Sequence, residues 1–218
     1  MPDIRTAAPP DAPQTLGWSE RLPWRLALLF CGLACFSLGL VLTLQSHVGL
    51  GPWDVFHQGL ARRLGISFGS ASIAVGFAIL LLAWALGAKP GVGSVANMAC
   101  VGAFVDLYLK LNIVPDLAAW PFPVRLLIDL LGVATVGLGT AIYIKANLGA
   151  GPRDGLMLTL ARRIDGPVSA IRIAIELAAL GSGFLLGGTA GLGTLIFALG
   201  VGPAIGVAFR LLGVQVKR

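Results

Sequence analysis

Long uncharged apolar stretches occupy most of the chain between residues 24 and 212. A helix that spans a membrane needs about 20 mostly apolar residues, and the stretches at 26–44 and 64–88 reach that length. The stretch 177–209 is too long for one span, and a glycine-rich segment at 187–193 divides it in two. The pattern therefore predicts six long helices, over residues 24–45, 68–87, 91–111, 124–145, 168–187 and 191–212.

A shorter and more polar helix is predicted between the first two long ones, over residues 53–64. At 1.5 Å per residue it would be about 18 Å long, too short to span a bilayer unaided. It carries Asp54, His57 and Gln58. Such a helix either lies at the membrane interface or enters the membrane as a half-helix packed inside protein, where polar backbone is tolerated.

A Gly-x-Gly-Pro-x-Asp element begins this short helix. Gly49 and Gly51 permit unusual backbone angles. Pro52 suits the first helical position, with Gly51 as the cap before it. Asp54 then falls in the first turn, where a negative charge is favoured by the positive end of the helix. Asp54 is therefore interpreted either as a helix-start residue in a loop or as part of a site.

The same element recurs 100 residues later without a gap, at 149–154, and predicts a second half-helix. Eight of the 16 positions from 49 to 64 are identical to their counterparts at 149–164. The repeat predicts one transmembrane domain over 23–218, with similar halves at 23–112 and 123–212. A disordered cytoplasmic tail is expected over residues 1–22, which are rich in proline, alanine and polar residues.

The relative direction of the two halves depends on the short helices. If each of them crosses the membrane, each half has four crossings and the halves are parallel; otherwise each has three and they are antiparallel. Antiparallel halves would place one member of each matched arginine pair outside, against the positive-inside tendency. The matched pairs therefore favour parallel halves with both termini cytoplasmic, and the antiparallel alternative stays open. These pairs are Arg25 with Arg125, Arg62 with Arg162 and Arg63 with Arg163.

Composition supports a membrane protein and excludes other classes. Charged residues make up 12% of the chain and hydrophobic residues 56%, whereas soluble domains are about 25% charged. This excludes an ordinary soluble domain, a disordered chain and a nucleic-acid binder. The 30 glycines suit helices packed closely in a bilayer. We expect a multi-pass protein of the cell membrane whose partner is the lipid bilayer, and a homo-oligomer is left open.

Several motifs resemble one family of bacterial membrane proteins. Gly-x-Gly-Pro-Trp-Asp at 49–54, Pro90-Gly-x-Gly and Gly102-x-x-x-Asp106 are similar to the YczE/YyaS/YitT-type group of multi-pass proteins. The resemblance implies an integral membrane location and carries no assigned activity. The second half departs from the pattern, with Arg153 at the position of Trp53 and Gly206 at that of Asp106.

Charged residues within the apolar stretches are functional candidates, because they are costly in a membrane. Arg172 and Glu176 are spaced i, i+4, so their side chains can meet. They form a structural ion pair or part of a substrate or proton pathway, or else Arg172 extends to the cytoplasmic interface from its place near the helix start. The same spacing predicts two further local pairs, Asp106 with Lys110 and Arg125 with Asp129.

Two helix breaks, one in each half, are typical of a transporter site. The sequence therefore predicts a small secondary transporter or channel-like permease for an unknown small molecule or ion, with its site between the halves. The candidate pathway residues are Trp53, Asp54, Asp106, Asp154, Arg172 and Glu176. The candidate structural residues of the breaks are Gly49, Gly51, Pro52, Gly149, Gly151 and Pro152.

Two other classes of function compete with transport. A membrane protein that acts in assembly or regulation through helix–helix contacts would expose stripes of small residues, whereas transport requires a polar cavity between the halves. An intramembrane enzyme is disfavoured, because the sequence has no Ser/His/Asp cluster, phosphate-binding loop or HExxH motif. Two isolated histidines and three cysteines without a CxxC pair predict neither a metal nor a cofactor.

Overall fold

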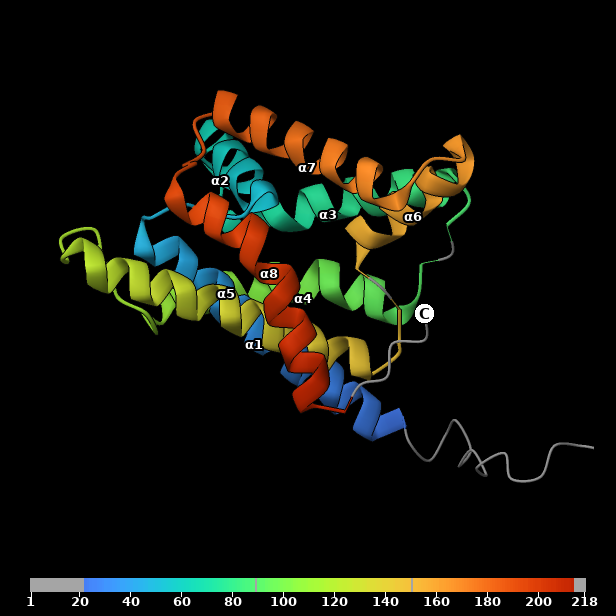
Figure 1. Cartoon of the computed structure of the whole chain (residues 1–218), viewed down its shortest axis with the longest axis horizontal. Coiled ribbons are helices and arrows are strands. Elements are labelled where there is room, and N and C mark those ends of the chain that lie inside the picture. The colour runs from blue at the N-terminus through green and yellow to red at the C-terminus, as the bar shows by residue number, and fades with distance from the viewer. Residues whose placement is uncertain (1–21, 89, 150, 214–218) are drawn as a thin grey trace, which may run out of the picture.

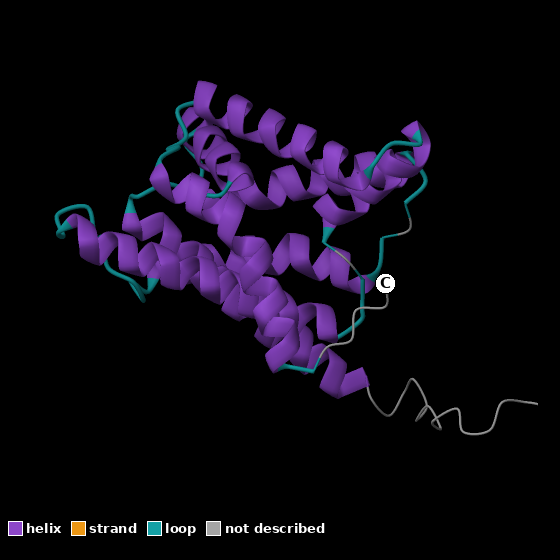
Figure 2. Cartoon of the chain, viewed as in Figure 1, coloured by secondary structure: helices purple, strands orange, loops and turns teal. Residues whose placement is uncertain are grey.

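The computed structural model describes residues 22–88, 90–149 and 151–213, so the predicted tail lies almost wholly outside the described residues. In this part of the chain all regular structure is helical (Figure 2). Six helices are long and apolar enough to cross a membrane, which confirms the predicted all-α polytopic class of six long and two short helices. The helices are α1 (Leu22–Ser46), α2 (Pro52–Leu64), α3 (Phe68–Ala85), α4 (Val92–Lys110), α5 (Phe122–Lys145), α6 (Pro152–Ile164), α7 (Val168–Leu185) and α8 (Leu192–Leu211).

The helices form two groups that the chain visits alternately (Figure 1). The long helices α1 and α5 lie side by side and share the largest interface, with α4 packed on α1 and α8 on α5. On the other side, α2 packs on α7 and α6 on α3, so each short helix contacts a long helix of the opposite half. Each group thus contains helices from both halves of the chain, α1–α4 and α5–α8.

Helices α1 and α5 run antiparallel, so the parallel arrangement favoured by the arginine pairs is wrong. Near the start of α1, Arg25 donates to the carbonyl of Ala146, just after α5 ends, over 2.8 Å. Near the start of α5, Arg125 donates to the carbonyl of Ser46, at the end of α1, over 2.7 Å. With one helix reversed, these two arginines lie at opposite ends of the helix pair.

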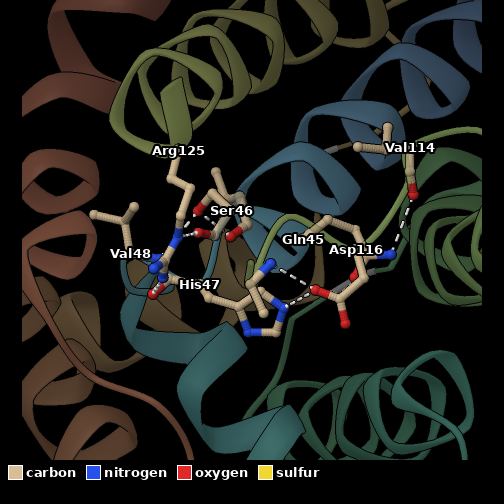
Figure 3. Close-up of polar contacts among 9 residues, drawn as sticks. Gln45, Ser46, His47, Val48, Val114, Asp116 and Arg125 are labelled. Carbon is tan, nitrogen blue, oxygen red and sulfur yellow. Dashed lines mark hydrogen bonds and ion pairs between the residues drawn. The ribbon is translucent and has the colours of Figure 1, made fainter. Parts of the chain in front are cut away.

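The arginines are retained for a reason that the positive-inside argument does not consider. The last carbonyls of a helix have no partner within the helix and carry partial negative charge. Figure 3 shows Arg125 directed at this end of α1, where it donates to the carbonyls of Ser46 and His47. Arg62 of α2 likewise donates to the carbonyl of Gly187 after α7, and Arg163 of α6 to that of Leu86 after α3. Each arginine caps a helix of the opposite half.

Glycines bring α1 and α5 into backbone contact. A Cβ atom built on Gly32 would lie 2.4 Å from the backbone nitrogen of Tyr143, and one built on Gly139 would lie 2.3 Å from that of Phe36. Real Cβ atoms essentially never approach other atoms so closely. These positions therefore admit only glycine at this helix separation, as expected for small residues at membrane helix interfaces.

The predicted local pair of Arg125 with Asp129 is also wrong, because both side chains are engaged across the helix interface. Arg125 caps α1, and the fully buried Asp129 accepts a hydrogen bond from the Ser46 hydroxyl over 3.0 Å. The loop before α5 adds contacts at the same place: His47 meets Asp116 at 2.7 Å, and Gln45 donates to the carbonyl of Val114 (Figure 3).

The antiparallel arrangement predicts opposite exposure of the ends of the two short helices. Helix α2 ends where α3 begins, whereas Arg163 places the end of α6 beside the end of α3. Because α3 is long enough to span the membrane, cysteines introduced at Leu64 and Ile164 should be labelled by an impermeant reagent from opposite sides. Labelling of both from one side of intact cells would contradict the arrangement.

The glycine contacts predict a large stability difference between two Gly→Ala changes. Gly139→Ala would force α1 and α5 apart, and overpacking of this kind costs about 1–3 kcal/mol. Gly181→Ala on α7 meets open space and should be neutral or raise stability by about 0.5–1 kcal/mol, because alanine favours the helix. Melting temperatures of the purified proteins in detergent measure both, and an equal effect of the two changes would contradict the packing described.

Candidate functional site

The two short helices begin as their sequence predicts. Gly51 is extended at φ −57° and ψ 154° and serves as the cap residue before Pro52, and the corresponding cap of α6 is Gly151, at φ −60° and ψ 159°. Asp54 and Asp154 lie in the first turns. The two Gly-Pro starts therefore each present a carboxylate at the equivalent position of the helix.

Both starts open on one cavity. Its volume is about 480 Å³, and every one of the eight helices contributes to its wall. The cap glycines and the prolines that follow them line it on both sides. Of the six predicted pathway residues, five line the cavity, namely Trp53, Asp54, Asp154, Arg172 and Glu176.

Asp106 lies elsewhere, although the sequence placed it with the other five. Its carboxylate accepts hydrogen bonds from the Gly69 amide, over 2.8 Å, and from the Ser67 hydroxyl, over 2.5 Å, at the start of α3. Free amides at a helix start are satisfied in this way by a side-chain acceptor. Asp106 therefore joins the end of α4 to the start of α3, which also replaces the predicted local pair with Lys110.

The outer glycines of the two motifs hold the breaks rather than line the cavity. Gly49 has φ +148° and Gly149 has φ +127°, values that glycine adopts readily. Beside Gly49, the carbonyl of Val48 accepts from the amide of Gly193 at the start of α8. Beside Gly149, the carbonyl of Leu148 accepts from the amide of Gly93 at the start of α4. Each break is therefore anchored on the last helix of the opposite half.

The two differing motif positions meet across the cavity. The guanidinium carbon of Arg153 lies 4.9 Å from the ring centre of Trp53, which is within the range of a cation–π interaction. Arg153 Nη2 also lies 3.3 Å from His57 Nε2, at hydrogen-bond distance. The arginine that departs from the family pattern thus links the start of α6 to the first turns of α2.

The carboxylate of Asp54 is buried and incompletely paired. Asp54 is 2% exposed and His57 is 1% exposed. Asp54 Oδ1 and His57 Nδ1 lie 3.6 Å apart, and neither atom has a hydrogen-bond partner among the residues that the structure describes. An unsatisfied buried polar atom lowers the free energy of unfolding by about 1–3 kcal/mol. A contribution to the stability of the helix start alone therefore does not explain why this pair is present.

The second charged group of the cavity is the ion pair on α7. Arg172 Nε lies 2.9 Å from Glu176 Oε1, as the i, i+4 spacing predicts. The Arg172 side chain is 52% exposed and that of Glu176 is 31% exposed. Such exposed pairs contribute little to stability, but both members of this pair line the cavity, so the pairing does not remove them from it.

Sequence reasoning missed several polar residues of the wall. Arg153 was noticed only as a departure from the motif. It contacts His57, which was noticed only as a polar residue of the short helix, and this contact joins residues 96 positions apart. Asn97, Thr140 and Tyr143 line the cavity as well, and each is a polar residue within a mostly apolar helix. The usable signal was the presence of Arg153 directly beside the motif carboxylate Asp154.

Comparisons with known proteins agree with this description. A model of a family of unknown function, DUF6198, matches residues 23–210. The chain is 32% identical to the uncharacterised membrane protein YczE of Bacillus subtilis over 182 residues, which cover 83% of each chain. It is 32% identical to an uncharacterised protein of Haemophilus influenzae over 180 residues, covering 83% of this chain and 81% of the relative.

A further relative is YyaS of Bacillus subtilis, 26% identical over 166 residues, which cover 76% of this chain and 82% of YyaS. No solved structure matches the chain. The resemblance to YczE and YyaS drawn from the motifs is thereby confirmed. The six apolar helices fit the membrane location stated for YczE. The chain therefore belongs to the DUF6198 family and is a multi-pass membrane protein.

Proposed function

We propose that this protein is a small secondary transporter or channel-like permease whose substrate passes through the cavity at the starts of α2 and α6. One observation carries the proposal: two Gly-Pro helix breaks from opposite halves open on the same cavity, whose wall includes five charged side chains. Broken helices that meet near the centre of a membrane protein are the usual construction of a transporter site. Irregular backbone at that depth is tolerated where it lines a wet cavity.

The charges of the wall favour a substrate with a positively charged group. Three carboxylates, Asp54, Asp154 and Glu176, line the cavity together with two arginines, Arg153 and Arg172. At neutral pH this leaves a formal excess of one negative charge. A small cation, or a zwitterion whose amino group meets Asp54, complements this excess, since buried charges need partners.

The cavity also separates transport from the rival function in assembly or regulation. A protein that acts only through its outer helix faces has no use for a buried carboxylate without a complete set of partners. Maintaining the unsatisfied Oδ1 of Asp54 lowers stability, and a ligand that binds there would recover that loss. The polar interior thus supports transport more than a purely structural role.

Water access to the cavity provides a test that needs no known substrate. In a variant without the native cysteines, we expect Thr140→Cys, in the cavity wall, to react with a small water-soluble thiol reagent. Leu138→Cys lies two residues away on α5, is 39% exposed on the outside of the helix bundle, and should stay unlabelled in lipid. Equal and negligible labelling of both would argue against a wet pathway.

Removing the motif carboxylates should abolish uptake without loss of folding. Proteoliposomes are assayed with a panel of radiolabelled amino acids, polyamines and inorganic cations. For any compound taken up, Asp54→Asn and Asp154→Asn should slow uptake at least about tenfold, because a lost hydrogen bond to a charged group costs about 1.5–3 kcal/mol.

Asp106→Asn is the matched control for these two variants, because it removes the same charge outside the cavity and should leave uptake within about twofold. Expression and melting temperature are measured for all three proteins. If the two cavity variants lose expression while their folded fraction transports normally, the carboxylates serve helix starts alone.

A further inference from the structure

His57 lies between a carboxylate and a guanidinium that belong to different halves of the chain. On α2 it faces Asp54, with 3.6 Å between His57 Nδ1 and Asp54 Oδ1. From α6 it meets Arg153, at 3.3 Å from Nε2. From α3 the edge of Phe68 contacts the ring, with 5.9 Å between centroids, and α7 meets α2 through the backbone of Gly183.

The chemistry of these neighbours fixes the protonation state of the ring. An arginine guanidinium can only donate hydrogen bonds. His57 Nε2 must therefore accept, which requires a neutral ring whose single proton is on Nδ1. That proton is directed at Asp54 Oδ1, and both atoms are among the three buried side-chain atoms without a hydrogen-bond partner in the described structure, the third being Asp129 Oδ2.

We propose that Asp54 and His57 form a proton-binding site, and that loading of this site releases Arg153 from His57 and thereby weakens the link between α6 and α2, leaving the contact of Arg153 with Trp53. One proton from the cavity adds to the lone pair of His57 Nε2, and no other bond forms or breaks. The ring becomes an imidazolium with two donors. Its Nδ1–H pairs with the Asp54 carboxylate, while its Nε2–H has nothing to accept from Arg153.

The released arginine has other partners within the same cavity. Like charges repel strongly at this distance in a medium of low dielectric constant, so the imidazolium displaces the guanidinium. The carboxylates of Asp54, Asp154 and Glu176 act on the charge of Arg153 and line the same cavity. Once the Asp54 carboxylate pairs with the imidazolium, Asp154 and Glu176 remain as partners for the guanidinium. A proton on the Asp54–His57 pair thus exchanges a contact between the halves for contacts within the second half.

The role of this proton as a coupling ion rests on the proposed transport function, but its binding does not. We would follow the two ring nitrogens of each histidine by NMR in full-length protein labelled with ¹⁵N-histidine. The chain contains two histidines, so His47→Gln leaves the signal of His57 alone. His47, which pairs with Asp116 on an exposed loop, serves in the native protein as the reference for an accessible ring.

We expect neutral His57 to carry its proton on Nδ1, and to become doubly protonated as the pH is lowered through the range in which the protein stays folded. Arg153→Met should remove the preference for Nδ1 and shift the titration to higher pH, because a neighbouring cation is lost. Arg153→Lys, which keeps the charge, should retain a titration at lower pH than Arg153→Met.

Three results would overturn the proposal: a neutral ring protonated on Nε2, a ring that stays neutral throughout this pH range in folded protein, or a titration unchanged by Arg153→Met. Folding at each pH is checked by circular dichroism. None of these measurements uses a transported compound. Failure here therefore leaves the accessibility of Thr140→Cys as a separate measure of the proposed pathway.

Discussion

The last carbonyls of a helix have no partner within the helix and need one elsewhere. This constraint determines how the two halves of the chain meet. In the described structure the ends of α1, α3, α5 and α7 each receive an arginine from the opposite half. The donors are Arg125, Arg163, Arg25 and Arg62, in that order. The backbone breaks beside Val48 and Leu148 are held in the same reciprocal way by the starts of α8 and α4.

Hydropathy predicts where the long helices lie, but it does not predict the contacts by which each half caps the helices of the other. Length and apolar content determine which segments can span a bilayer, so the six long helices were predictable to within about two residues at most ends. Direction was not, because the positive-inside tendency considers only the side on which an arginine lies. Arg25 and Arg125 are retained because each satisfies carbonyls of the other helix, a contact that is invisible in either segment alone.

The site was predictable where it depends on local chemistry and unpredictable where it depends on distant contacts. Gly51, Pro52 and Asp54 form a helix start whose geometry follows from the residue types themselves. Asp106 was misplaced because a carboxylate near a helix end looks the same whether it faces a cavity or a neighbouring helix start. His57 gains its importance from Arg153, 96 residues away, and no local pattern indicates that pairing.

The difference between the two motif copies has a simple physical reason in this arrangement. Positions 53 and 153 lie face to face at the starts of α2 and α6. Two arginines at positions 53 and 153 would repel, whereas Trp53 and Arg153 attract through the aromatic face of the indole. His57 also has no counterpart in the second copy, where Met157 stands, so the surroundings of the two motif carboxylates differ.

Capping of each half by the other also determines when the protein can complete its folding during synthesis. The ribosome delivers α1 well before Arg125, and the start of α8 that anchors the break at Val48 emerges only with Gly193. Until then the backbone groups at these helix ends lack the partners that they have in the folded protein. Packing of the helices is therefore completed only after the last helix has been synthesised, because the earliest helices depend on it for their hydrogen bonds.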